Sequence, residues 1–162
     1  MNKFIKLIFS LFFLCVFFVL LLVILFGNKS YTDYQYDNPN EFRNSSSFSW
    51  YVNIFPKSSR NIFLRTFVET NESIIIFISN KIDELPYSHL YSIKSIDKAE
   101  SILKNLNIPS DKKQDFLDKG ELYCYFYQKD STYLVSKYYS NDDLVHYMFI
   151  DLQPRDALAI CR

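Results

Sequence analysis

The sequence contains very little glycine, with only two glycines among its 162 residues. Loops that cradle a phosphate group need glycine, because their backbone N–H groups must come close to the ligand. The shortage therefore excludes a phosphate-binding loop, and with it the nucleotide-binding enzymes that depend on one.

Histidine and cysteine are also scarce, since only His89, His146 and three cysteines occur. Zinc sites usually contain closely spaced ligands such as Cys-x-x-Cys or His-x-His, and the sequence has neither pattern. No glycine-rich turn surrounds a cysteine to support a nucleophilic Cys–His pair. We expect no metal and no cofactor, and we interpret His146 as a strand residue held by hydrogen bonds.

Catalytic motifs are limited to two short matches. The segments Ser95–Lys98 and Ser101–Lys104 fit the Ser-x-x-Lys pattern of penicillin-recognising enzymes, but the companion motifs Ser-Asp-Asn and Lys-Thr-Gly are missing. Such matches are expected by chance in a chain rich in serine and lysine. The sequence favours a non-catalytic protein, and a membrane-tethered hydrolase that uses Ser95 or His146 is the alternative.

Neither sign of charge dominates, because 18 basic residues balance 18 acidic ones. Lys3, Lys6 and Lys29 lie within or beside an apolar segment, so the rest of the chain has 15 basic and 18 acidic residues, a net charge of −3. Proteins that bind nucleic acid need a basic face. We therefore predict no nucleic-acid partner.

The most prominent feature is an apolar run from Leu7 to Phe26, broken only by Ser10 and Cys15. Its 20 residues would form a helix of about 30 Å, which matches a bilayer core. A cleaved signal has a shorter apolar region and small residues at its exit, and a lipoprotein cysteine follows the run. The sequence predicts a transmembrane signal-anchor over residues 1–27, held in lipid through residues 7–26, with a cleaved signal as the alternative.

Flanking charge predicts the orientation of this helix. Lys3 and Lys6 precede it closely, whereas Lys29 and Arg43 follow at wider spacing. Positive charge favours the cytoplasmic side. We expect a single-pass cell-membrane protein with a cytoplasmic N-terminus and an extracytoplasmic C-terminal domain.

Two cysteines, Cys124 and Cys161, lie in the part expected outside the membrane. A pair of cysteines in an exported domain can form a disulfide. The bond would close a loop of about 38 residues and contribute roughly 4 kcal/mol in the chain-entropy treatment. Two unpaired thiols are the alternative.

The remaining sequence predicts a flexible linker followed by one domain. Residues 28–47 are polar and lack a helical or strand period, with three tyrosines that either lie at the membrane interface or are simply exposed. Residues 48–162, about 115 in number, suffice for one core.

Hydrophobic patterns in residues 48–162 predict strands first, then helices, then strands. Helices are expected from Asp97 to Leu106, from Asp111 to Asp118 with Gly120 as a left-handed terminator, and for one turn after Pro154. The fold class is therefore α+β, with an antiparallel sheet and one or two helices between the strand groups. The six expected strands are Phe48–Phe55, Asn61–Glu69, Glu72–Ser79, Leu122–Gln128, Thr132–Tyr139 and Leu144–Leu152.

The last three strands carry apolar or aromatic residues on both faces, so both faces need a cover. We expect the helix from Asp97 to cover one face, and the first strands, a partner or a second copy to cover the other. Tyrosines on an ordinary exposed face are the alternative. The predicted interaction surface comprises Tyr123, Tyr125, Tyr127, Tyr147 and Phe149.

Together these features suggest an exported domain, held at the membrane, that binds a protein partner without catalysis. In a bacterium this architecture fits an immunity protein or an envelope accessory protein. Besides the hydrolase, the alternative is a structural subunit of a membrane complex.

Overall fold

The computed structural model describes residues 12–18, 31–46, 54–67, 69–70, 72–85, 89–127, 131–140 and 143–162. Most of the strand predicted at Phe48–Phe55 lies outside them, and Ile54 and Phe55 are not in a strand. The elements, in order, are β1 (Tyr31–Tyr36), α2 (Pro39–Arg43), β2 (Arg60–Phe67), β3 (Glu72–Asn80), η2 (Lys81–Asp83), α3 (Ile96–Asn105), α4 (Ser110–Lys119), β4 (Glu121–Tyr127), β5 (Ser131–Tyr139), β6 (Leu144–Asp151) and α5 (Pro154–Ile160).

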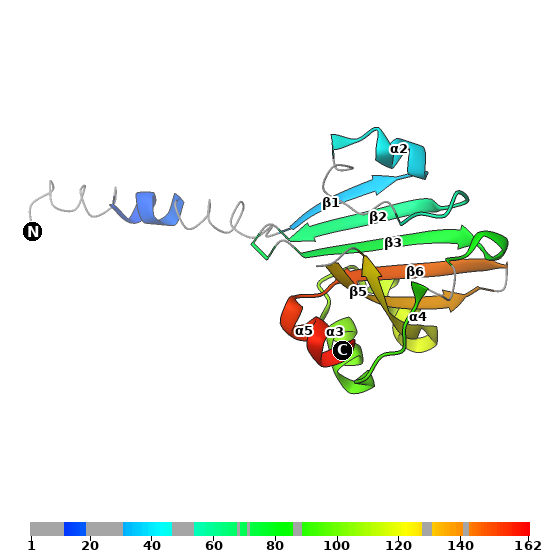
Figure 1. The fold of residues 1–162 in the computed structure, drawn as a ribbon. Coiled ribbons are helices and arrows are strands. Elements are labelled where there is room, and N and C mark those ends of the chain that lie inside the picture. Colours follow the sequence, from blue (N-terminus) through cyan, green and yellow to red (C-terminus); the bar gives the residue numbers. More distant parts are fainter. Residues whose placement is uncertain are drawn as a thin grey trace, which may run out of the picture.

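The strands form one sheet in the order β1-β2-β3-β6-β5-β4 (Figure 1). Every neighbouring pair is antiparallel. The β2–β3 hairpin and the β4–β5–β6 meander meet where β3 pairs with β6, with Ile76 opposite Met148. The predicted α+β fold with a six-stranded antiparallel sheet is therefore confirmed.

Three helices, α3, α4 and α5, cover one face of this sheet (Figure 1). Leu103 of α3, Phe116 of α4 and Ile160 of α5 are buried against alternate residues of the central strands, among them Leu134 and Met148. Alternation along a strand sends neighbouring side chains to opposite faces. The helices thus bury one of the two apolar faces, as expected for α3.

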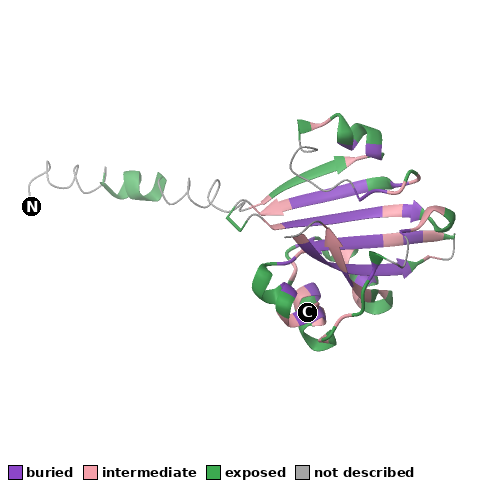
Figure 2. Ribbon diagram, in the orientation of Figure 1, coloured by how far each residue is buried: buried purple, intermediate pink, exposed green. Residues whose placement is uncertain are grey.

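The second face has a thinner cover made of short segments. This cover packs on the core residues of the strands that face away from the helices. It consists of Phe42 of α2, Ile54, Phe55, Leu85 and Leu90. Of the first strands expected, β2 and β3 continue the same sheet and do not form this cover, whereas Ile54 and Phe55, at the end of the strand expected at Phe48–Phe55, are part of it. Figure 2 shows the result, since the central strands are largely buried while β1 is mostly exposed.

The sequence predicted a linker at residues 28–47, whereas the structure places β1 and α2 within residues 31–46. Asn38 caps α2 by accepting hydrogen bonds from two backbone N–H groups. Arg65 of β2 donates from Nε and Nη2 to the carboxylate of Asp33, at 2.6 and 2.7 Å. Arg65 also donates to the carbonyl of Asn107, so one side chain joins the edge strand to the helix layer.

The predicted membrane-spanning segment lies largely outside the described residues. Residues 12–18 form a helical stretch whose side chains are exposed. None of the helices in the described ranges has the length and apolarity needed to cross a bilayer.

Gly120 ends α4 for a different reason from the one expected. Its φ is −74°, so it is not a left-handed terminator. A Cβ atom at this position would collide with the side-chain oxygen of Ser136 and the carbonyl oxygen of Phe116. Glycine is needed here because α4 turns closely against β5.

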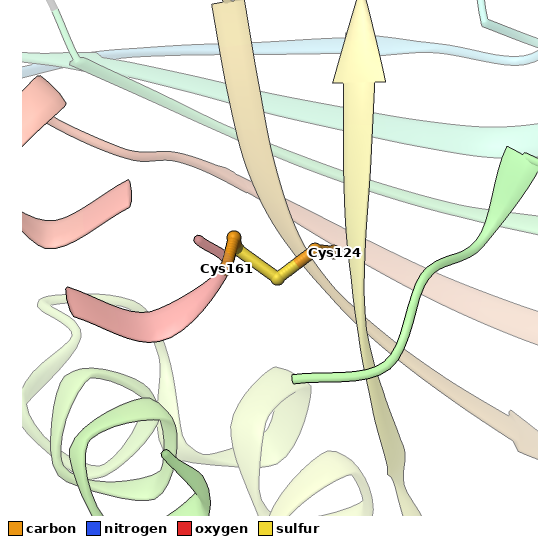
Figure 3. Close-up of a disulfide and its surroundings, with 2 residues drawn as sticks. All are labelled: Cys124 and Cys161. Atoms are coloured by element: carbon orange, nitrogen blue, oxygen red, sulfur yellow. A yellow bond between two sulfur atoms is a disulfide. The ribbon is translucent and has the colours of Figure 1, made fainter. Parts of the chain in front are cut away.

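Cys124 of β4 and Cys161, just after α5, form a disulfide (Figure 3). Their Cα atoms are 5.8 Å apart, and Cys124 is fully buried in the core beneath the helices. The backbone of Cys124 also exchanges two hydrogen bonds of 2.8 Å with Tyr91. One residue thus fixes the end of α5 and the loop before α3 to the edge of the sheet.

We predict that the double variant Cys124→Ala/Cys161→Ala unfolds at a lower urea concentration, with a loss of about 4 kcal/mol in the free energy of unfolding. The reason is that the unfolded chain is no longer constrained by the cross-link. Cys15→Ser is the matched control, because Cys15 is a free, exposed cysteine, and it should leave the midpoint unchanged. An equal effect of both changes would contradict the assigned role of the disulfide.

Candidate functional site

The five aromatic residues predicted as an interaction surface all lie on the sheet face covered by the short segments. Tyr123, Tyr125 and Tyr127 alternate along the edge strand β4 and are partly buried. Tyr147 and Phe149 lie two strands away on β6. The structure therefore brings all five to one face.

Tyr147 and Phe149 are not on the surface, because both have an exposed fraction of 0%. The ring of Tyr147 stacks on Phe77, and its hydroxyl accepts a 3.0 Å hydrogen bond from the backbone N–H of Leu85. Phe149 packs edge-on against Tyr125. These two residues must be removed from the predicted surface, and only the three tyrosines of β4 remain partly accessible.

A buried charged cluster lies on the same face. The side chain of Lys137 on β5 has an exposed fraction of 0%, and its Nζ lies 3.7 Å from a carboxylate oxygen of Glu84. Nζ also donates to the hydroxyl of Tyr139 at 3.0 Å, and this hydroxyl donates to Glu84 at 2.9 Å. The ring of Tyr123 lies on another side, with its centroid 5.8 Å from Nζ.

This cluster fixes the segment that follows η2 to the sheet. Glu84 and Leu85 are adjacent, and both bond to strand residues, through Tyr139 and Tyr147 respectively. A buried ammonium is costly unless it is paired and hydrogen-bonded, and here it has both kinds of partner. The arrangement can hold a cover closed over the sheet. An open hollow of about 510 Å³ lies beside it, lined by Asn80, Lys81, Ile82, Asp143 and Leu144, and the ammonium of Lys81 lies 5.5 Å from the ring centroid of Tyr139.

A second cluster of titratable groups lies on the helix-covered face. His146 of β6 stacks on Tyr138 of β5 with ring centroids 4.4 Å apart, and the hydroxyl of Tyr138 lies 3.4 Å from Asp115 on α4. Burial lowers the pKa of His146, and burial together with the charge of Asp115 raises the pKa of Tyr138 to about 12. The histidine is therefore neutral near pH 7.

The structure does not bring together the residues named for the hydrolase alternative. His89 packs near Tyr125 on one face of the sheet, and His146 lies on the other. Ser95 is the residue that precedes α3, and no hydrogen bond between Ser95 and His146 occurs among the described residues. Likewise, within the described ranges no three potential ligands come together to hold a metal ion.

An acidic hollow of about 290 Å³ lies at the end of the sheet where β1 begins. It is lined by Glu72, Asp151, Asp156 and parts of α3. Burial and the negative charge of Glu72 raise the pKa of Asp151 to about 6. The carboxyl group is therefore partly protonated in mildly acidic solution.

Sequence reasoning missed Lys137 and Arg65, the two cations that are buried among the residues the structure describes. A weak signal was present, because each occupies a strand position flanked by residues that alternate into the core. Their partners, Glu84 and Asp33, are 53 and 32 positions away along the chain. Nothing local in the sequence indicates such pairs.

In comparisons with known proteins, no family model, no curated protein and no solved structure matches this chain.

We predict that Glu84→Ala lowers the free energy of unfolding by roughly 1–3 kcal/mol, because the charge of Lys137 stays buried after its carboxylate partner is lost. The double variant Glu84→Ala/Lys137→Met should recover most of this loss, since the buried charge is then removed as well. Denaturant unfolding of the four chains of the cycle measures the coupling. Strictly additive effects would show that the two side chains do not act as a pair.

We also predict a pH-dependent effect at Asp151. Its pKa is higher in the folded state than in the unfolded chain, so the protein loses stability as the pH rises from about 4 to about 6, above which the carboxyl group is ionised in both states. Asp151→Asn should therefore stabilise the protein by about 1 kcal/mol at pH 8, after allowance for partial exposure, and have almost no effect at pH 4.

Thermal unfolding at the two pH values measures this difference for Asp151. The control is Asp143→Asn, at an exposed residue with a φ of 57°, a conformation that asparagine also adopts. The Asp143→Asn change should have the same small effect on the melting temperature at both pH values. A gain from Asp151→Asn that is the same at pH 4 and pH 8 would contradict the assignment.

Proposed function

We propose that this protein is a single-pass membrane protein whose extracytoplasmic α+β domain binds a protein partner at the membrane surface without catalysis. In a bacterium, the corresponding role is that of an immunity protein or an envelope accessory protein. The apolar segment at residues 7–26 contacts lipid, and the N-terminus lies in the cytoplasm.

The observation that carries the proposal is the disulfide between Cys124 and Cys161, which follows a 20-residue apolar run in the same chain. Disulfides persist in oxidising compartments and are rare in the cytosol. Cys124 lies within the core rather than on the surface, so the cross-link is built into the fold. An exported domain explains both features together.

The start of the fold supports a position close to the membrane. The apolar run ends at Phe26 and β1 begins at Tyr31, so only residues 27–30 separate them. Four fully extended residues span at most about 14 Å. Because tethering confines the domain to a thin layer, it raises the local concentration of the domain for any partner in the same membrane.

The row of tyrosines on β4 is the surface proposed for the protein partner. Tyr123, Tyr125 and Tyr127 lie on an edge strand and retain some exposure. Tyrosine offers a rigid apolar ring together with a hydroxyl that can form a hydrogen bond, and it is enriched at protein interfaces. Tyr127 lies at the end of the strand, so its ring can contact a partner while the core residues of the sheet stay covered.

One experiment on the full chain in living cells tests both parts of the proposal. Thiols are blocked at lysis before any reduction, and a photo-crosslinking amino acid replaces Tyr127. We expect only Cys15 to be alkylated before reduction, and all three cysteines after it. We also expect a discrete adduct with a different protein, identified by mass spectrometry.

The control for the crosslink is the same amino acid at Lys98, an exposed position on α3 in the helix layer. It should give no adduct with that protein. Alkylation of Cys124 and Cys161 without reduction would overturn export, and equal adducts from positions 98 and 127 would overturn the surface.

A further inference from the structure

The first strand forms one open edge of the sheet. β1 is hydrogen-bonded to β2 on one side, and in the described part of the chain no backbone group of residues 31–35 bonds on the other side. Most of β1 is exposed (Figure 2), and the exposed residues are Thr32, Asp33, Tyr34 and Gln35. An open edge of this kind is a template for another strand.

The edge has few of the devices that usually prevent pairing, although it is short and its one charged residue, Asp33, points to a sheet face. Natural edge strands carry lysine, proline or a bulge, or are covered by another segment. β1, with the sequence YTDYQY, contains no basic residue, proline or glycine, and its only charge, on Asp33, is held by Arg65. At the opposite edge, the bridge between Tyr91 and Cys124 occupies the middle of β4.

The side chains of β1 fall into two rows. Tyr34 lies opposite Leu64, whose side chain is in the core on the face with the short cover. Asp33 and Gln35 point to the helix-covered face, because they lie opposite Arg65 and Phe63. Strands that pair antiparallel place opposite residues on the same face, so this division limits the registers in which two copies can pair.

We propose that β1 pairs antiparallel with β1 of a second copy of this chain, with Tyr34 facing Tyr34 on the two-fold axis. In this register, Asp33 of each copy faces Gln35 of the other, and an amide can donate to a carboxylate. Two aromatic rings meet at the axis, a favourable cross-strand pair. The two sheets become one continuous sheet through an isologous interface.

The two neighbouring symmetric registers are disfavoured by charge. An axis through Gln35 would place Asp33 of each copy opposite Asp37 of the other, just beyond the strand. Shifting the strands so that the axis passes through Asp33 would place two carboxylates directly opposite each other, and like charges in this position are destabilising. A shift by one residue would place the residues of one row opposite those of the other row, although the two rows point to different faces of the sheet. The sequence of β1 therefore favours a single self-complementary register.

A second copy is a better occupant than a strand from a different protein for two reasons. In the register above, the side chains of β1 in one copy find complementary side chains on β1 of the other. The two strands are also always present at equal concentration, because they belong to copies of the same chain. An interface of one short strand is small, and confinement in a membrane raises the effective concentration of the copies. The inference goes beyond the proposed function, since it requires neither the partner nor the tyrosines of β4, and it rests on that function only for the confinement of the copies in a membrane.

Cysteine crosslinking in the full chain with Cys15→Ser tests the pairing. Tyr34→Cys places two thiols on the axis with Cα atoms about 5 Å apart, within reach of a disulfide. Thr32→Cys, on the same face, places the two thiols about 14 Å apart along the strands. We expect a dimer on a non-reducing gel for Tyr34→Cys and a monomer for Thr32→Cys.

Co-purification of two differently tagged copies gives an independent measurement. Tyr34→Lys should reduce it at least fivefold through repulsion at the axis, whereas Tyr34→Phe should preserve it. Both variants should keep the Cys124–Cys161 disulfide, which shows that they fold. Absence of a dimer, equal crosslinking at positions 32 and 34, or a crosslink from position 34 only to another protein would overturn the inference, whatever the outcome for export.

Discussion

The pairing of β3 with β6 is the constraint on which the rest of the structure depends. These two strands join the hairpin to the meander, and both carry large apolar residues on both faces. A sheet that is apolar on both sides must be covered twice. The helix layer on one face, and the short segments around Phe42 and Leu85 on the other, follow from this requirement.

The sequence was sufficient to predict the α+β class, the antiparallel hairpin and meander, and both helices between them, because these features rest on local hydrophobic periods and turn residues. It was insufficient for β1, because its polar sequence, without a strand period, resembles a linker. That strand is held by its antiparallel pairing with β2 and by the contact of Asp33 with Arg65, which only the folded chain brings together. Long-range ion pairs leave no local signal in a single sequence.

The candidate surface was predicted in part for a related reason. Alternation correctly placed Tyr147 and Phe149 on the same face as the tyrosines of β4. Alternation cannot show which strands lie in the middle of a sheet, and β6 is a middle strand while β4 is an edge. Burial of Tyr147 and exposure at Tyr127 thus follow from strand order, and strand order depends on the pairing of distant segments.

The two covers of the sheet are fastened by different means. A covalent bond and the three-way contact of Arg65 secure the helix side. On the opposite side, besides apolar packing, the hydroxyl of Tyr139 donates to Glu84, and the hydroxyl of Tyr147 accepts from the backbone N–H of Leu85. We therefore expect local opening to require less free energy on that second side. One face of the sheet then has a firmly held cover and the other has a cover that opens more readily. Native-state amide exchange should therefore be faster for the segments that cover the second face than for the helices on the first.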